Sequence, residues 1–226
     1  MRKTDYALLE TYMLSCMGDS AHDKDHIYRV LYVALDIAGR ERDVDYDVLI
    51  AACLLHDIGR GEQFANPALC HAAIGADMAY HFLTAHGYSA DCAGRVAQCI
   101  RVHRFRNDNP PAAIEEKILF DADKVEASGA IGIARTLLYN GRIGEPLYSL
   151  TDDGEVSDGT ADISPSFFEE YKHKLERLYG KFFTERGREI ARERQHTAIA
   201  FYDSLFRETA GSYRNGLQLL SHQLEG

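Results

Sequence analysis

Apolar residues recur at helical spacing along almost the whole chain, and this periodicity strongly restricts the possible folds. Two such stripes comprise Ile27, Val30, Leu31, Ala34 and Ile37, and Met78, Ala79, Phe82 and Leu83. Residues three, four and seven positions apart lie on one face of an α-helix. No segment shows a convincing strand-like alternation of apolar and polar residues. The sequence therefore predicts an all-α fold.

Residues that favour turns divide the first 140 residues into about six or seven helices. The breaks fall at Gly18 to Ser20, Gly39 to Asp45, Asn66 and Pro67, Gly87 to Ser89, Asn107 to Pro111, and Gly129. Residues 141–165 carry several Gly and Asp and two Pro, so they read as a long polar loop, which is usually either functional or disordered. Over 166–226 the helical pattern resumes, most simply as two long amphipathic helices. We expect one domain, in which 1–140 form a helical core and the C-terminal helices pack on it.

The bulk properties favour a soluble cytoplasmic protein with a small ligand. At 226 residues the chain can bury roughly 70% of the surface that its unfolded form exposes. Its five cysteines are scattered, odd in number and mostly in apolar helical pattern, which favours reduced thiols. The sequence begins without an apolar leader and contains no run of ~18 uncharged apolar residues, so we expect no signal peptide and no membrane partner. A formal net charge of −10 opposes binding of a nucleic-acid polymer, whereas a small phosphorylated ligand is easier to accommodate.

Adjacent imidazole and carboxylate side chains, those of His56 and Asp57, follow an apolar helical run and precede Gly59, where we expect the helix to end. On a helix the two side chains differ in direction by about 100°, so both can bind one ion placed between them. His26 upstream and the acidic run 121–124 downstream offer further ligands. These nitrogen and oxygen donors suit a divalent ion such as Mn, Fe, Co, Ni or Zn. The plainer alternative is a pair of core histidines bonded to nearby carboxylates.

The ordered set His26, His56, Asp57 and Asp123 resembles the H…HD…D signature of the HD superfamily of metal-dependent phosphohydrolases. In that family the last ligand lies between an alanine and a basic residue, as Asp123 does here. The resemblance therefore implies an HD-domain helical bundle and one divalent ion per chain, held by these four residues. Manganese is the ion expected first, with Fe, Co, Ni, Zn or Mg as alternatives. Asp121 is then expected outside the ligand set as a residue that orients water, the alternative being a carboxylate on the helix surface.

Four further residues are expected to contact a phosphorylated substrate. The stretch ending at Arg60 resembles the Asp-Ile-Gly-Lys stretch of HD-type cyclic dinucleotide phosphodiesterases, so Arg60 is expected to bind a phosphoryl oxygen and stabilise the transition state. His71 and His103 match positions that hold a second metal in that group. Because Arg104 replaces the histidine that follows there, we expect them to contact phosphate or to act as the general acid. Lys124 can also reach phosphate. The alternatives are a surface role for Arg60 and Lys124, and a helix-surface or capping role for His71 and His103.

The sequence departs from the motifs of two HD subgroups, and these departures restrict the functions that it can have. The His-Asp-x-x-Glu motif of HD nucleotidases has Arg60 in place of the glutamate, and the long Gly-Tyr-Pro signature of the cyclic-dinucleotide enzymes is absent. Segments 23–30, 120–135 and 167–194 instead resemble small stand-alone bacterial HD hydrolases, of which some are nucleoside triphosphate pyrophosphohydrolases. That resemblance implies attack of metal-activated water on the α-phosphorus of a nucleotide, with pyrophosphate leaving. The residues themselves support only metal-dependent hydrolysis of a phosphoester or phosphoanhydride.

Other functions and states stay open. The runner-up is a 5′-nucleotidase or a phosphodiesterase, and outside catalysis the alternative is a nucleotide or metal sensor. The chain is expected to be a monomer or a homodimer. We expect the polar loop 141–165 to lie beside the entrance of the site as a mobile cover that selects substrates by size and shape.

Overall fold

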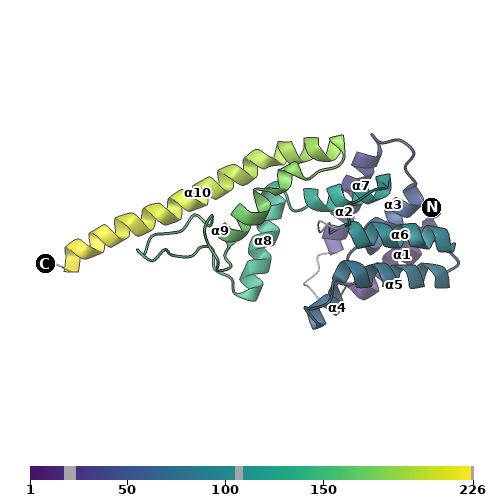
Figure 1. The fold of residues 1–226 in the computed structure, drawn as a ribbon, viewed down its shortest axis with the longest axis horizontal. Coiled ribbons are helices and arrows are strands. Elements are labelled where there is room, and N and C mark those ends of the chain that lie inside the picture. The colour runs from purple at the N-terminus through teal and green to yellow at the C-terminus, as the bar shows by residue number, and fades with distance from the viewer. Residues whose placement is uncertain (18–23, 105–108, 225–226) are drawn as a thin grey trace. The chain divides into compact units, whose positions relative to one another are not determined.

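A computed structural model of the protein describes residues 1–17, 24–104 and 109–224 (Figure 1). Within these ranges the regular elements are helical, apart from one antiparallel bridge between Leu150 and Val156. The all-α prediction is therefore confirmed. The break expected at Gly18 to Ser20, and positions 107 and 108 of the break expected before Pro111, lie outside the described residues. In the described part of the chain, no helix has both the length and the hydrophobicity needed to cross a membrane.

Two compact units make up the described chain. The first comprises Met1–Glu126 and Phe182–Gly187, and the second comprises Ala127–Lys181 and Arg188–Gly226. Helices of the first unit are α1 (Lys3–Cys16), α2 (Lys24–Ala38), α3 (Tyr46–Leu55), α4 (Arg60–Ala65), α5 (His71–Ala85), α6 (Ala90–Val102) and α7 (Ile114–Val125). The predicted packing of the C-terminal helices on the core stays a prediction.

Helix α3 lies at the centre of the first unit. It packs against α1, α2, α6 and α7, and its buried residues include every position from Ala51 to Leu55. A helix that is apolar all round must be buried on all sides, which explains its central place. Asp45 caps its start by accepting hydrogen bonds from the backbone N–H groups of Asp47 and Val48. The predicted stripe of α2 is buried as well, so the end of α3 and the start of α2 are both held in the core.

Residues 46–65 form two helices, and the break between them contains Gly59, where the sequence predicted the end of a helix. Helix α3 ends at Leu55, and α4 begins at Arg60 after a turn that contains Gly59. A Cβ on Gly59 would lie 2.3 Å from the carbonyl oxygen of His71 and 2.7 Å from the backbone nitrogen of Gly75. Only glycine permits this close approach, which packs the turn directly against the backbone of α5.

The second unit contains α8 (Gly129–Ile143), the short α9 (Phe167–Glu170) and most of α10 (Glu185–Leu224). A π-helical turn, Tyr171–Leu175, and a 3₁₀ turn, Leu178–Gly180, lie between α9 and α10. The prediction of two long C-terminal helices was therefore wrong: there is one helix of 40 residues, preceded by short turns. The helical periodicity runs through both segments without a proline, so the sequence shows the interruption only weakly, at Gly180.

The polar loop of the second unit is tied together by its own side chains. The carboxylate of Asp162 accepts hydrogen bonds from the hydroxyl groups of Ser149 and Ser157. The hydroxyl of Tyr202, on α10, donates to the backbone carbonyl of Asp158 over 2.6 Å. Residues 141–165 contain four aspartates, and two of them, Asp158 and Asp162, thus make contacts that hold the loop together. Its role as a mobile cover stays a prediction.

Candidate metal centre

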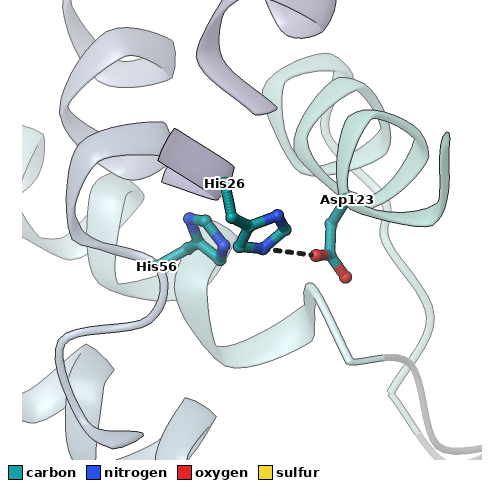
Figure 2. Close-up of side chains that lie close together, drawn as sticks. All are labelled: His26, His56 and Asp123. Carbon is teal, nitrogen blue, oxygen red and sulfur yellow. Dashed lines mark ion pairs between the residues drawn. The ribbon is translucent and has the colours of Figure 1, made fainter. Parts of the chain in front are cut away.

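Helix ends of the first unit bring the predicted ligands together. His56 lies at the end of α3, His26 in the first turn of α2, and Asp123 near the end of α7. Ligand atoms of these three residues all lie within 4.8 Å of one another. Figure 2 shows the imidazole of His26 between His56 and Asp123, with its Nε2 3.4 Å from Oδ1 of Asp123. Three of the four predicted metal ligands therefore form one cluster.

Asp57 belongs to a second cluster, with His71 and His103, whose ligand atoms also lie within 4.8 Å of one another. Its carboxylate faces both clusters. Oδ1 lies 3.4 Å from Nε2 of His71 and 3.7 Å from Nε2 of His103. Oδ2 lies 3.7 Å from Nε2 of His26 and 3.6 Å from Nε2 of His56. One carboxylate thus lies between two pairs of imidazoles.

Hydrogen bonds to the backbone fix which imidazole nitrogen carries the proton. Nδ1 of His56 lies 2.8 Å from the carbonyl oxygen of Cys53, and Nδ1 of His103 lies 2.6 Å from that of Ile100. A carbonyl oxygen only accepts hydrogen bonds, so Nδ1 is the donor in each ring. Nε2 of each ring is then a bare acceptor directed at the cluster, which is the state of a histidine that binds a metal.

Several acceptor atoms of the two clusters are buried without a donor. Among the described residues, no hydrogen-bond partner contacts Nε2 of His56, His71 or His103, or Oδ1 of Asp57. A buried polar atom left in this state costs about 1–3 kcal/mol, so four together need an explanation. A divalent cation would satisfy all of them, and imidazole and carboxylate are suitable ligands. The residues therefore fit a metal centre.

The ionisation of the clusters also suits a cation. Burial lowers the pKa of His71 to about 3, with the nearby charge of Arg60 adding to the effect. Burial and the neighbouring His56 lower the pKa of His103 to about 4. Both imidazoles are therefore neutral near pH 7, as metal ligands must be.

Both carboxylates of the clusters are ionised despite their burial. Burial opposes ionisation of Asp57, but the positive charge of Arg60 outweighs it and holds the pKa of that carboxyl well below its usual range. For Asp123, burial is likewise outweighed, here by hydrogen bonding to His26 and by the charge of Lys124, so its pKa is also well below the usual range. Neutral imidazoles and charged carboxylates together attract a cation.

Cationic side chains surround the clusters. The Nε atom of Arg60 donates to Oδ2 of Asp57 over 2.5 Å, and its side chain is 34% exposed. Nη1 of Arg104 lies 3.3 Å from Nδ1 of His71, and Nζ of Lys124 lies 3.7 Å from Oδ2 of Asp123. Arg60 and Arg104 therefore lie where an anion approaching the clusters would meet them. Because His71 and His103 are fully buried, the alternative that they lie on helix surfaces was wrong.

The sequence did not indicate two residues that orient the imidazoles. Oε1 of Gln63 lies 2.6 Å from Nδ1 of His71. Oε2 of Glu126 lies 3.7 Å from Nδ1 of His26 and accepts a hydrogen bond from Nε of Arg29 over 2.6 Å. Glu126 follows Asp123 by three positions, and that helical spacing was the only available signal.

Asp121 is fully buried, so the alternative that it is a carboxylate on the helix surface was wrong. Its Oδ2 accepts hydrogen bonds from the backbone N–H of Thr184 over 2.7 Å and from the Thr184 hydroxyl over 2.6 Å. Its Oδ1 accepts from the backbone N–H of Phe183 over 2.9 Å. Asp121 thus attaches the start of α10 to α7. A Cβ on Gly187 would lie 2.6 Å from Oδ2, so the contact requires glycine there. The predicted role in orienting water stays a prediction.

A cavity of about 370 Å³ lies elsewhere in the first unit, lined mainly by residues of α6 and α7. Its buried carboxylates already have partners: Glu115 accepts from the backbone N–H of Asp45, and Glu116 accepts from that of Ala112. The cavity therefore holds carboxylates that stabilise the fold, whereas the clusters around Asp57 hold acceptors without donors.

Comparisons with known proteins agree with this geometry. The family described as the HD domain matches residues 24–128, a range that contains both clusters. YpgQ from Bacillus subtilis (strain 168) is 29% identical over 209 residues, which cover 90% of this chain and 93% of YpgQ.

Solved structures extend the likeness to the fold. The crystal structure of Bacillus subtilis YpgQ in complex with ADP matches with a TM-score of 0.70 and 29% identity, over 91% of this chain and 98% of that one. A predicted HD-superfamily hydrolase from an uncultured Thermotogales bacterium matches with a TM-score of 0.61 and 27% identity, over 92% and 99%. With its His and Asp clusters inside the matched range, this chain contains an HD domain at residues 24–128 and is similar to YpgQ over nine tenths of its length.

Proposed function

We propose that the chain is a metal-dependent phosphohydrolase that cleaves a nucleoside triphosphate to the monophosphate and pyrophosphate. The observation that carries the proposal is the carboxylate of Asp57, buried between two pairs of imidazoles. Among the described residues, its Oδ1 and the Nε2 atoms of His56, His71 and His103 lack donors. Such a site attracts a divalent ion, and an ion with open positions supplies a nucleophilic water near neutral pH.

His26, His56, Asp57 and Asp123 are proposed to hold the ion. The close approach of His26, His56 and Asp123, and the distances from Asp57 Oδ2 to His26 and His56, support this set. Arg60 is proposed to bind a phosphoryl oxygen while it keeps Asp57 ionised, because its side chain contacts that carboxylate and is one-third exposed to solvent. A charge-assisted contact of this kind stabilises the transition state more than the ground state. Lys124 is proposed as a second contact for phosphate.

The cluster of Asp57, His71 and His103 favours a second ion over the general-acid role expected for these histidines. Their ligand atoms lie as close together as those of the first cluster, and low pKa values leave both imidazoles without the extra proton that a general acid donates. Among the described residues, no donor contacts Nε2 of either histidine, and Nη1 of Arg104 lies 3.3 Å from Nδ1 of His71. We therefore propose room for two ions that share Asp57, with contact to phosphate as the alternative role of the two histidines.

A nucleotide is proposed as the substrate because YpgQ, similar over nine tenths of this chain, forms a crystalline complex with ADP. The cations around the clusters suit a polyphosphate. A 5′-nucleotidase or phosphodiesterase would use the same ligands, and a nucleotide sensor would bind without turnover.

A product assay separates these functions. Protein stripped of metal, then loaded with Mn²⁺, is incubated with a panel of nucleoside triphosphates, nucleoside monophosphates and a generic phosphodiester, and the products are separated by chromatography. The proposal expects a nucleoside monophosphate and pyrophosphate in equal amounts. Orthophosphate with a nucleoside would indicate a nucleotidase, cleavage of the diester alone a phosphodiesterase, and binding without products a sensor. Asp57→Asn should be inactive, whereas Asp91→Asn, which changes an exposed aspartate of α6, should match the wild type.

A further inference from the structure

His71 differs from His103, the other imidazole of its cluster, in what its Nδ1 atom contacts. Nδ1 of His103 lies against a backbone carbonyl oxygen, which can only accept a hydrogen bond. Nδ1 of His71 instead meets two side chains, with Oε1 of Gln63 at 2.6 Å and Nη1 of Arg104 at 3.3 Å. The oxygen accepts hydrogen bonds and the guanidinium nitrogen only donates them. The two contacts therefore favour different positions of the proton on this ring.

The position of that proton decides what Nε2 of His71 can do. An imidazole that binds a cation is neutral, so only one of its nitrogens carries a proton. With the proton on Nδ1, Nε2 is a bare acceptor 3.4 Å from Oδ1 of Asp57, and both atoms are buried without a donor among the described residues. With the proton on Nε2, that atom can donate to Oδ1 of Asp57, and the two atoms satisfy each other. Only the first form leaves the cluster ready for an ion.

The distances favour the contact of His71 with Gln63. An N–H donor normally lies about 2.7–3.2 Å from its acceptor, so 2.6 Å indicates a close hydrogen bond and 3.3 Å a weak one. We propose that Gln63 is a positioning residue: it accepts a hydrogen bond from Nδ1 of His71 and thereby keeps Nε2 free for an ion held with Asp57 and His103. This inference rests on the second ion of the proposed function. Without Gln63, the donor Arg104 should draw the proton to Nε2.

Nitrogen NMR of metal-free protein with isotope-labelled histidine reads the tautomer directly, because a bare ring nitrogen and an N–H nitrogen resonate far apart. The signals of His71 are those that are missing in His71→Ala. In the wild type the proton should be on Nδ1. Gln63→Leu has no acceptor and should move it to Nε2, whereas Gln63→Glu, whose carboxylate only accepts, should keep it on Nδ1. Gln98→Leu makes the same change at a half-buried glutamine of α6 and should not alter the tautomer.

Titration with Mn²⁺ by calorimetry tests the consequence for metal binding. Gln63→Leu should weaken the binding of one of two ions about 10–100-fold and leave the other within about twofold, because the hydrogen-bond partner of a metal-binding histidine orients its ring. Gln63→Glu and Gln98→Leu should bind both ions as the wild type does. Circular dichroism should be the same for the wild type and both Gln63 variants, because no residue of α4 is buried.

Neither measurement needs turnover, so both are separate from the proposed reaction. If the wild type forms no pyrophosphate while Gln63→Leu changes both the tautomer and the metal affinity, the proposed reaction fails and the role of Gln63 stands. Four results would overturn the inference: a proton on Nε2 in the wild type, a single bound ion in the wild type, an unchanged tautomer in Gln63→Leu, or a changed tautomer with unchanged metal binding.

Discussion

Two buried carboxylates of the first unit lie in opposite surroundings. Asp121 accepts hydrogen bonds at both oxygens, from the backbone of Phe183 and from Thr184. Asp57 is bound by Arg60 at one oxygen, while the other has no donor among the described residues and faces two imidazoles. Burial alone therefore does not identify a functional carboxylate. The unsatisfied oxygen of Asp57 indicates a ligand, and the satisfied oxygens of Asp121 indicate an anchor of the fold.

The largest expected effect is the loss of activity on changing Asp57. Asp57→Ala should reduce hydrolysis to background and prevent metal binding, because both clusters lose the carboxylate that they share. Its free energy of unfolding without metal should fall less than that of Asp121→Ala. Rates with Mn²⁺, metal titration and urea unfolding measure the three quantities. Full activity of this variant would end the assignment of Asp57 as a ligand.

Asp121→Ala should act on stability instead. It leaves the N–H groups of Phe183 and Thr184 and the Thr184 hydroxyl without their acceptor, so unfolding should become easier by about 3 kcal/mol, at about 1–3 kcal/mol for each buried donor. Below its unfolding midpoint the variant should keep more of its metal affinity than Asp123→Ala, which removes a ligand. A titration in which Asp121→Ala loses more metal affinity than Asp123→Ala would show that Asp121, and not Asp123, is the ligand.

Arg60→Ala should lower catalysis at the site of Asp57 without removing the metal. It should lower kcat/KM on the order of 10²-fold while metal occupancy is retained, because one charge-assisted contact in a buried site is worth about 3 kcal/mol in the transition state. Atomic absorption on the loaded variant checks occupancy, and steady-state kinetics measure the loss. Wild-type kinetics would show that the guanidinium contacts only Asp57 and not the substrate.

Acid should weaken the metal-free fold through the cluster histidines. The folded-state pKa of His103, about 4, is below the value near 6.5 of an unfolded histidine, so between these values the unfolded chain binds the extra proton. Stability should therefore fall as pH is lowered through this window, by about 2 kcal/mol for His103 between pH 7 and pH 5. Urea unfolding at the two values measures it. His103→Gln should show a smaller decrease, and an equal or larger one would contradict the account.

Local sequence features predicted much of the fold and the site. Helical periodicity predicted the all-α class and the buried stripe of α2, since each depends on neighbours in the same helix. His56 and Asp57 could be predicted as metal ligands because they are adjacent, follow an apolar helical run and precede Gly59. The partners of Asp121 lie more than 60 positions away, at Phe183 and Thr184, and no local pattern encodes such a contact.

The sequence also could not predict that the ligands divide into two clusters. Whether His71 and His103 face the same ion as His26 depends on how α5 and α6 pack against the turn at Gly59. Because Arg104 replaces one residue of a motif, the sequence predicted that His71 and His103 contact phosphate or act as the general acid and do not bind a second ion. The structure instead keeps both imidazoles around Asp57, because their positions follow from helix packing and not from the neighbouring residue.

Metal titration of stripped wild-type protein tests whether the two clusters form a metal centre. We expect chelator-treated protein to be inactive and Mn²⁺ to restore formation of pyrophosphate from a nucleoside triphosphate. The same addition should raise the unfolding midpoint, because the ion binds only the folded clusters. Saturation at two ions per chain would support the sharing of Asp57, and saturation at one would favour contact of His71 and His103 with phosphate. Full hydrolysis in excess chelator, or no change in the unfolding midpoint with any divalent ion, would contradict a metal centre at these clusters.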